Sequence, residues 1–183
     1  MNRLNITAIL LTAYLAVFFQ TRQDGLRNLC GAQIDLLPSL MVYCALNTGL
    51  AVFTAMAVLA GLWFDAFSAN PLGITILPLF VIALVINWNR ELILRDQRYA
   101  QFVLGCLASA LAPLFTVLLL FGGGHKPLIG WGSLWQWLVM AVAGGVFTPA
   151  FFWLFDRLNQ AFSYQQLPES SFRQDREIKR GRF

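Results

Sequence analysis

The chain alternates between long apolar blocks and short polar stretches. Each block is continuously hydrophobic and shows no polar stripe at helical spacing, which is typical of helices whose surroundings are apolar on every side. We therefore predict an all-α integral membrane protein. The predicted helices cover residues 4–20, 34–47, 49–67, 72–89, 99–121 and 134–156.

Composition supports the membrane prediction. Hydrophobic residues make up 58% of the 183 positions, charged residues make up 12%, and the mean hydropathy is +0.63. A soluble domain carries about 25% charged residues, because its surface must face water. The net charge of +4 comes from basic residues that cluster at the ends of the blocks. Such clustering indicates orientation in a bilayer, so we do not expect a nucleic-acid partner.

The block at 34–47 raises the question of five or six membrane passes. Its 14 residues span only about 21 Å, whereas the hydrocarbon core of a bilayer is roughly 30 Å thick. If it crosses, ten of the thirteen basic residues lie on the side of the N-terminus; if it merges with 49–67, most of them lie outside. Cytoplasmic segments carry the excess of Lys and Arg, so we predict six transmembrane helices with both termini cytoplasmic. The ten are Arg3, Arg90, Arg95, Arg98, Arg157, Arg173, Arg176, Lys179, Arg180 and Arg182.

The chain divides into two regions of different composition. Residues 1–162 form the predicted six-helix transmembrane domain, and residues 163–183 form a polar, basic tail that we expect to be disordered in the cytoplasm. Pairs of small residues at four-residue spacing would let helix backbones approach closely within the domain. These pairs are Ala45/Gly49, Ala57/Gly61, Gly105/Ser109 and Ala141/Gly145.

Ionisable residues are scarce within the predicted helices. Asp35, Asp65 and Asp156 each lie near the end of a block, and His125 is the only histidine. Transport and intramembrane catalysis usually need ionisable groups at membrane depth, so we predict no enzyme, no catalytic residue, no metal site and no cofactor. Asp65 has two interpretations: it contacts a ligand or partner near the outer surface, or it organises the 68–71 turn by accepting backbone N–H groups. Asn70 and Pro71 would then begin the next helix as its N-cap and first residue.

Several short stretches resemble the bacterial rod shape-determining MreD family. They are Ile34-Asp35-Leu36-Leu37-Pro38, then Gly61-Leu62-Trp63-Phe64-Asp65-Ala66-Phe67-Ser68, then Pro71-Leu72-Gly73, and finally Thr148-Pro149 before Phe155-Asp156-Arg157-Leu158. The resemblance covers about residues 4–160. It implies a non-enzymatic scaffold of the cell-elongation machinery in the bacterial cytoplasmic (inner) membrane, which maintains cell shape by organising lateral-wall peptidoglycan synthesis.

The resemblance also implies partners and motif positions. The partners would be the bilayer, the single-span shape protein MreC and, through it, the actin-like MreB filament and the peptidoglycan synthases. The motif positions are Gly61, Asp65, Pro71, Leu72 and Gly73, and Asp35 is a further candidate for partner contact. Arg90, Arg95 and Arg98 would present a basic patch to the cytoplasm.

A second hypothesis places the chain in a different functional class. The substrate-binding subunits of energy-coupling-factor vitamin transporters are also six-helix membrane proteins of this size. Such a subunit needs a polar pocket at its outer side, which Asp35, Asp65, Asn70 and the outer tryptophans would line.

Overall fold

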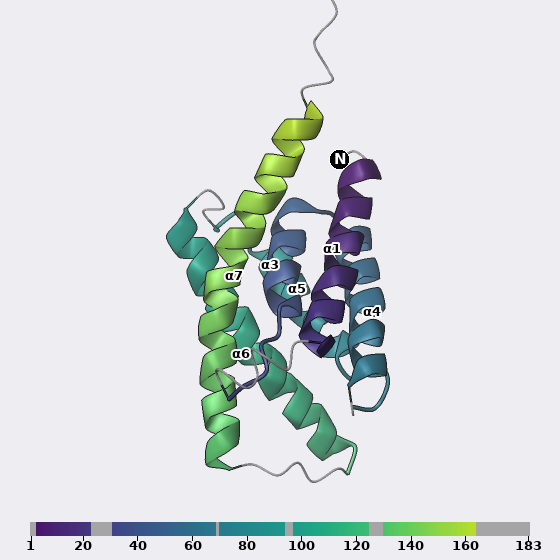
Figure 1. The fold of residues 1–183 in the computed structure, drawn as a ribbon, viewed down its shortest axis with the longest axis vertical. Coiled ribbons are helices and arrows are strands. Elements are labelled where there is room, and N and C mark those ends of the chain that lie inside the picture. The colour runs from purple at the N-terminus through teal and green to yellow at the C-terminus, as the bar shows by residue number, and fades with distance from the viewer. Residues whose placement is uncertain (1–2, 23–30, 69, 94–96, 125–129, 164–183) are drawn as a thin grey trace, which may run out of the picture.

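The described part of the chain is entirely helical outside its turns and short connections. The computed structural model describes residues 3–22, 31–68, 70–93, 97–124 and 130–163. These ranges contain six helices, which confirms the predicted all-helical class (Figure 1). They are α1 (Arg3–Arg22), α3 (Leu37–Asn47), α4 (Leu50–Phe67), α5 (Ile76–Trp88), α6 (Arg98–Gly122) and α7 (Trp131–Ser163). Residues 164–183, most of the predicted tail, lie outside the described ranges.

Successive helices run in alternating directions, so the bundle has two ends (Figure 1). One end, called here the Arg98 end, holds the start of α1, the 48–49 turn, the residues after α5, the start of α6 and the end of α7. The opposite end, called the Asp65 end, holds the end of α1, residues 31–36 and the 68–75 connection. The described chain therefore begins and finishes at the same end of the bundle, as an even number of passes requires.

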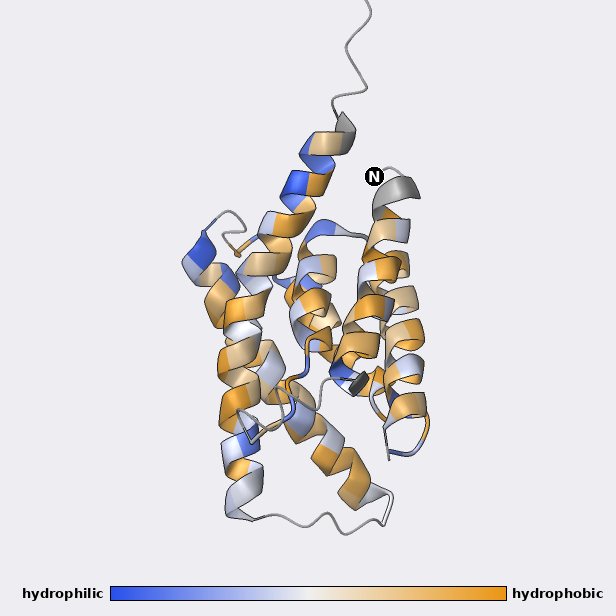
Figure 2. Cartoon of the chain, in the orientation of Figure 1, coloured by the Kyte–Doolittle hydropathy of each residue, from blue (hydrophilic) through white to orange (hydrophobic). Residues whose placement is uncertain are grey.

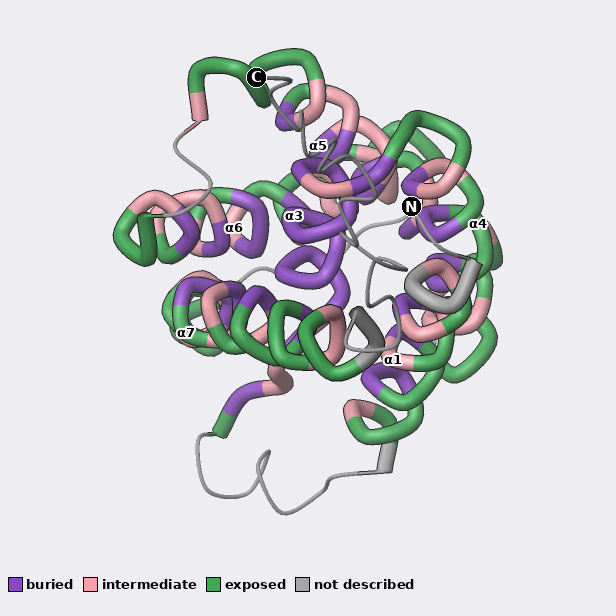
Figure 3. The backbone as a smooth tube through the Cα atoms, turned by 90° about the horizontal axis from the view of Figure 1, so that it is seen from above, coloured by how far each residue is buried: buried purple, intermediate pink, exposed green. Residues whose placement is uncertain are grey.

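The shortest helix is the centre of the molecule. Ten of the eleven residues of α3 are buried, and α3 contacts all five of the other described helices. Figure 3 shows α3 as a buried tube surrounded by the bundle. At 1.5 Å per residue α3 is about 16 Å long, too short to cross a bilayer alone. The side chains of α3 pack against the neighbouring helices and not against lipid. The segment before α3 is also enclosed, with Ala32 and Asp35 buried.

The outer faces of the bundle are suited to lipid. Three helices are long and apolar enough to cross a membrane, at Leu50–Phe67, Arg98–Gly122 and Trp131–Ala161. The other apolar helical stretches found among the described residues are shorter, at Ile6–Thr21, Leu37–Asn47 and Ile76–Trp88. Figure 2 shows hydrophobic residues over most of the helical surface, with hydrophilic residues gathered mainly towards the ends. By helix length and composition, the chain is a multi-pass membrane protein.

Glycine and other small residues bring α6 and α7 together along an extensive contact. A Cβ atom added to Gly105 would overlap Thr148 and the carbonyl oxygen of Gly144, and one added to Gly144 would overlap Ser109. The prediction for Gly105/Ser109 is confirmed, because both residues lie in this seam.

The other predicted small-residue pairs have mixed outcomes. Gly145 of the Ala141/Gly145 pair packs closely against Phe102 of α6, and Gly61 of the Ala57/Gly61 pair packs against Ile76 of α5. The prediction for Ala45/Gly49 is wrong, because an added Cβ at Gly49 would have no neighbour within 4 Å. Gly49 lies in the exposed turn beyond α3, where its φ of −87° suits any residue.

Helix boundaries agree with the prediction to within three residues, except at the end of α7 and around the 68–75 connection. The last helix continues to Ser163, beyond the predicted end at residue 156. The predicted helix at 72–89 begins only at Ile76, and residues 71–75 form turns. Asn70 is therefore not its N-cap, and Pro71 is not its first residue. Gly73 has a φ of 91°, a left-handed conformation that interrupts a right-handed helix and favours glycine.

Candidate functional site

Asp65 joins the end of α4 to the start of α5. Its side chain is only 2% exposed. The carboxylate accepts hydrogen bonds from the backbone N–H of Gly73 at 2.8 Å, from the backbone N–H of Thr75 at 3.1 Å, and from the Thr75 hydroxyl. These amides lie in the turn just before α5, where no preceding helical turn offers them an acceptor. The hydrogen bonds agree with the structural interpretation of Asp65, with the accepted amides lying just beyond the 68–71 turn.

The other motif positions surround the same connection, called here the Asp65 corner (Gly61, Asp65 and residues 71–76). Gly61 lets α4 approach α5, since an added Cβ would lie 2.9 Å from Ile76 Cγ1 and 3.1 Å from its backbone. Pro71 accepts a hydrogen bond from the N–H of Ile74 at 3.3 Å. Leu72 is 72% exposed and points away from the packed interior. Most of the motif therefore builds a tight corner between two helices, and Leu72 is its exposed apolar residue.

Asp35 forms a separate buried site before α3. It is 7% exposed and accepts hydrogen bonds from the N–H of Leu37 at 3.0 Å and from Gln20 Nε2 at 3.2 Å. The Gln20 Oε1 atom is buried and has no hydrogen-bond partner among the described residues. Asp35 lies in the connection between helices, and its burial raises its pKa from 3.8 to about 6 against the lowering effect of these hydrogen bonds.

Asp35 and Asp65 do not form one site in the described structure. Asp35 accepts hydrogen bonds from Gln20 and Leu37, whereas Asp65 accepts them from Gly73 and Thr75. The N–H of Asn70 donates to Ser68 Oγ at 3.3 Å. Each of these candidate pocket residues thus serves its own local connection.

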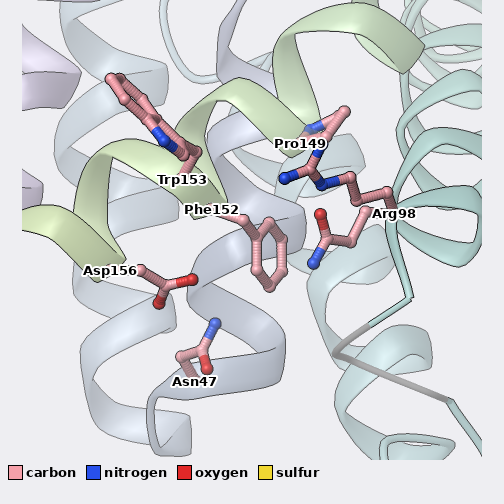
Figure 4. A pocket seen from close by; sticks show the side chains of 7 residues that line it. Asn47, Arg98, Pro149, Phe152, Trp153 and Asp156 are labelled. Atoms are coloured by element: carbon pink, nitrogen blue, oxygen red, sulfur yellow. The ribbon is translucent and has the colours of Figure 1, made fainter.

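A polar cavity of about 390 Å³ lies at the Arg98 end. Three helices line it: α3 contributes its last residue, α6 its first turn, and α7 the turns from Pro149 onward. Gln101 and Phe152 are buried, while Arg98, Trp153 and Asp156 are exposed at its rim. Figure 4 shows Arg98 on one side of Phe152, with Asp156 and Asn47 on the other. The lining residues are Asn47, Arg98, Gln101, Pro149, Phe152, Trp153 and Asp156.

The packing around α7 explains where the cavity opens. Pro149 removes one hydrogen bond from within α7, and Figure 1 shows the upper part of α7 leaning away from the start of α6. Tyr43 of α3 holds this part of α7, stacking on Phe155 at 4.4 Å and meeting Phe152 edge-on at 5.0 Å between ring centroids. The space between α6 and α7 consequently widens towards the Arg98 end.

The described residues of the predicted basic patch occupy different positions at the Arg98 end. Arg98 lines the cavity, whereas Arg90 is exposed in the turn after α5. Arg95 lies outside the described residues. Arg157 adds a further positive charge at this end, with its guanidinium 5.6 Å from the centre of the Trp153 ring.

Sequence reasoning missed the cavity because its lining comes from three distant segments. Of the lining residues, Arg98, Pro149 and Asp156 were notable in the sequence for other reasons. The available clue was Gln101, a polar residue one turn after Arg98 in an apolar helix. In the described ranges, no group of three or more His, Cys, Asp or Glu side chains is placed to hold a metal ion.

Comparison with known proteins gives no relative from which to transfer a function. No protein family model matches the chain, and neither the curated proteins nor the solved structures contain a match.

Proposed function

We propose that the chain is a non-enzymatic scaffold of the bacterial cytoplasmic membrane that acts in cell elongation, as its resemblance to the MreD family implies. The observation that carries this proposal is the Asp65 corner. Asp65, the ionisable residue of the resembling motif, accepts hydrogen bonds that fix the connection between α4 and α5. A structural role for this residue is what we expect of a non-enzymatic scaffold.

The apolar surface of α6 and α7 supports the same proposal. From Pro113 to Gly124 and from Gly130 to Ala143, no described residue is buried, and Trp131 is 88% exposed. The exposed large apolar side chains here, among them Leu118 and Trp131, are available to contact lipid or another membrane protein. A single transmembrane helix of a partner such as MreC would pack against this surface.

Orientation follows from the charges at the two ends. Arg90, Arg98 and Arg157 all lie at the Arg98 end, which we assign to the cytoplasm with both termini. The Asp65 end would then face outward, where the outer part of a single-span, peptidoglycan-associated partner would meet it.

Depletion in a rod-shaped host tests the cellular role. We expect cells to widen and lateral wall insertion, followed with a fluorescent wall precursor, to lose its distribution along the cylinder. Unchanged cell width and unchanged insertion after verified depletion would contradict the proposal.

Co-purification tests the molecular role. The variant with Trp131→Ala and Leu118→Ala, both at exposed positions, should lose a co-purifying single-span partner while remaining folded in detergent. Leu62→Ala, at an exposed position on α4, is the matched control and should retain the partner.

The vitamin-binding alternative finds less support. It needs Asp35 and Asp65 to face a shared outer pocket, and both carboxylates instead accept hydrogen bonds from their own chain. Recovery of a stoichiometric small molecule with the purified protein, without any single-span partner, would favour this alternative over the scaffold.

A further inference from the structure

The cavity at the Arg98 end has opposite charges on opposite sides. Arg98 offers the N–H donors of a guanidinium group, and the buried amide of Gln101 lies in the same lining. Across Phe152, Asp156 offers a carboxylate beside Asn47 (Figure 4). The Asn47 amide nitrogen donates to the carbonyl oxygen of Tyr43 at 3.1 Å, which leaves the amide oxygen as an acceptor. In the described part of the chain, no ion pair engages Arg98 or Asp156.

The depth of the cavity indicates what kind of molecule reaches it. Trp153 at its rim and Trp88 at the same end are both exposed, and tryptophan rings prefer the headgroup level of a bilayer. The cavity volume of about 390 Å³ lies within the range of small-ligand sites. The opening between α6 and α7 thus meets the bilayer where lipid headgroups are concentrated.

We propose that this cavity binds the headgroup of a zwitterionic phospholipid that carries a primary ammonium, namely phosphatidylethanolamine. The phosphate accepts hydrogen bonds from Arg98, because guanidinium groups recognise phosphate through several parallel N–H donors. The ammonium donates to Asp156 and Asn47. Phe152 and Pro149 form the apolar surface between the two polar groups, and Arg157 on Trp153 adds positive charge near the rim.

A headgroup with both a positive and a negative charge provides a partner for Asp156 as well as for Arg98. An anionic lipid such as phosphatidylglycerol would satisfy Arg98 but leave Asp156 beside a headgroup with no cation. A bare cation would leave Arg98 without a partner. The separation of the two charged residues by Phe152 therefore favours a ligand that has a positive and a negative group joined by a short linker.

The test measures lipid retention by the full-length protein. Purified protein in detergent is mixed with phosphatidylethanolamine or phosphatidylglycerol, and bound lipid is counted by native mass spectrometry. We expect the wild type to retain phosphatidylethanolamine preferentially. Arg98→Gln should lower retention of both lipids about tenfold, since a lost charge-assisted hydrogen bond is worth roughly that factor in affinity.

The variant Asp156→Asn separates the two charges. It should lose the preference for phosphatidylethanolamine while keeping the retention of phosphatidylglycerol. Arg90→Gln is the matched control, because Arg90 is exposed at the same end but does not line the cavity, and it should behave as the wild type. Both cavity substitutions are at exposed rim positions and are nearly isosteric, so folding, checked by gel filtration and thermal melting without lipid, should be preserved.

Other outcomes would overturn the proposal. Equal retention of the two lipids by the wild type, or equal losses in Arg90→Gln and Arg98→Gln, would show that only general surface charge acts. Non-additive loss of stability in the lipid-free single and double variants at Arg98 and Asp156 would assign the two residues to an ion pair with each other. Soluble phosphoethanolamine that stabilises the protein as well as the lipid does would identify a free metabolite as the ligand.

Discussion

At the residue scale, two carboxylates stabilise two of the connections between helices, Asp35 before α3 and Asp65 between α4 and α5. Asp65 and Asp35 are both almost completely buried, yet their hydrogen-bond partners differ in kind. Asp65 accepts two backbone N–H groups and a hydroxyl, whereas Asp35 accepts one backbone N–H and one amide. Removing each carboxylate should consequently have a different effect on stability.

Replacing Asp65 by Ala should destabilise the protein by about 3 kcal/mol, because the partly buried N–H of Gly73 and the buried N–H of Thr75 both lose their acceptor. The free energy of unfolding in detergent micelles, from a denaturant titration, measures the loss. Thr75→Val is the control that removes only the hydroxyl and should cost about 1 kcal/mol. Equal losses in the two variants would mean that the backbone hydrogen bonds contribute little.

Asp35 should give the protein a pH-dependent stability of the less usual sign. Because burial raises its pKa from 3.8 to about 6, the folded state holds the proton more tightly than the unfolded state. The contribution to stability is present below about pH 4 and is lost as pH rises towards 6 and beyond. Asp35→Asn removes the charge, so relative to the wild type it should gain up to about 3 kcal/mol at pH 7.5 compared with pH 4.

Thermal melting of both proteins across this pH range provides the measurement. Parallel melting curves for the wild type and Asp35→Asn at every pH would show that Asp35 titrates alike in the folded and unfolded states.

At the scale of elements, α6 and α7 pack closely because glycines at their contact carry no side chain. Replacing Gly144 by Ala should destabilise the seam by about 1–3 kcal/mol, because the new Cβ would overlap Ser109 and force the helices apart. Unfolding in detergent again measures the change. A Ser109→Gly substitution in the same chain should recover part of the loss, since it removes the overlapping atoms.

Gly132 offers a matched control on α7 for the Gly144 substitution. No atom lies within 4 Å of an added Cβ at Gly132, so Gly132→Ala should be neutral or slightly stabilising through helix propensity. A neutral Gly144→Ala variant would mean that the two helices separate at little cost.

The elements also show how far the sequence predicts the fold. Continuous apolar blocks predicted the six helices, because lipid and protein interior impose the same requirement on a helix surface. The central position of α3, predicted as the block at 34–47, could not be predicted. Hydropathy shows how apolar α3 is, but it does not show that five helices contact it. Of the candidate residues, Asp65 was interpretable because its neighbours in sequence are its partners in space. The cavity was not, because Asn47, Arg98 and Asp156 meet only after folding.

At the scale of the whole molecule, six alternating helices predict opposite sides of the membrane for Gly49 and Leu72. Both positions are exposed, one in the turn after α3 and the other at the Asp65 corner. In intact spheroplasts, a membrane-impermeant thiol reagent should label a cysteine introduced at Leu72 and should not label one introduced at Gly49. Permeabilised cells should give labelling at both positions.

Native cysteines provide an internal check on this experiment. Cys44 is buried in α3 and should stay unlabelled in the folded protein. Cys30, which lies outside the described residues, belongs to the connection that the topology assigns to the outside, and it should be labelled in spheroplasts. Labelling at Gly49 but not at Leu72 would reverse the orientation.

The enclosed position of α3 has a consequence for biosynthesis. A helix of about 16 Å that carries the buried polar side chain of Ser39 gains little from lipid on its own. Ser39 finds its acceptor, the carbonyl oxygen of Gly144, 105 residues later in the chain. The ribosome therefore delivers α3 to the membrane well before α7 exists to receive it. Until synthesis is nearly complete, this segment depends on α1 and α4 or on the insertion machinery, and chains truncated before α7 should be preferred substrates of membrane proteases.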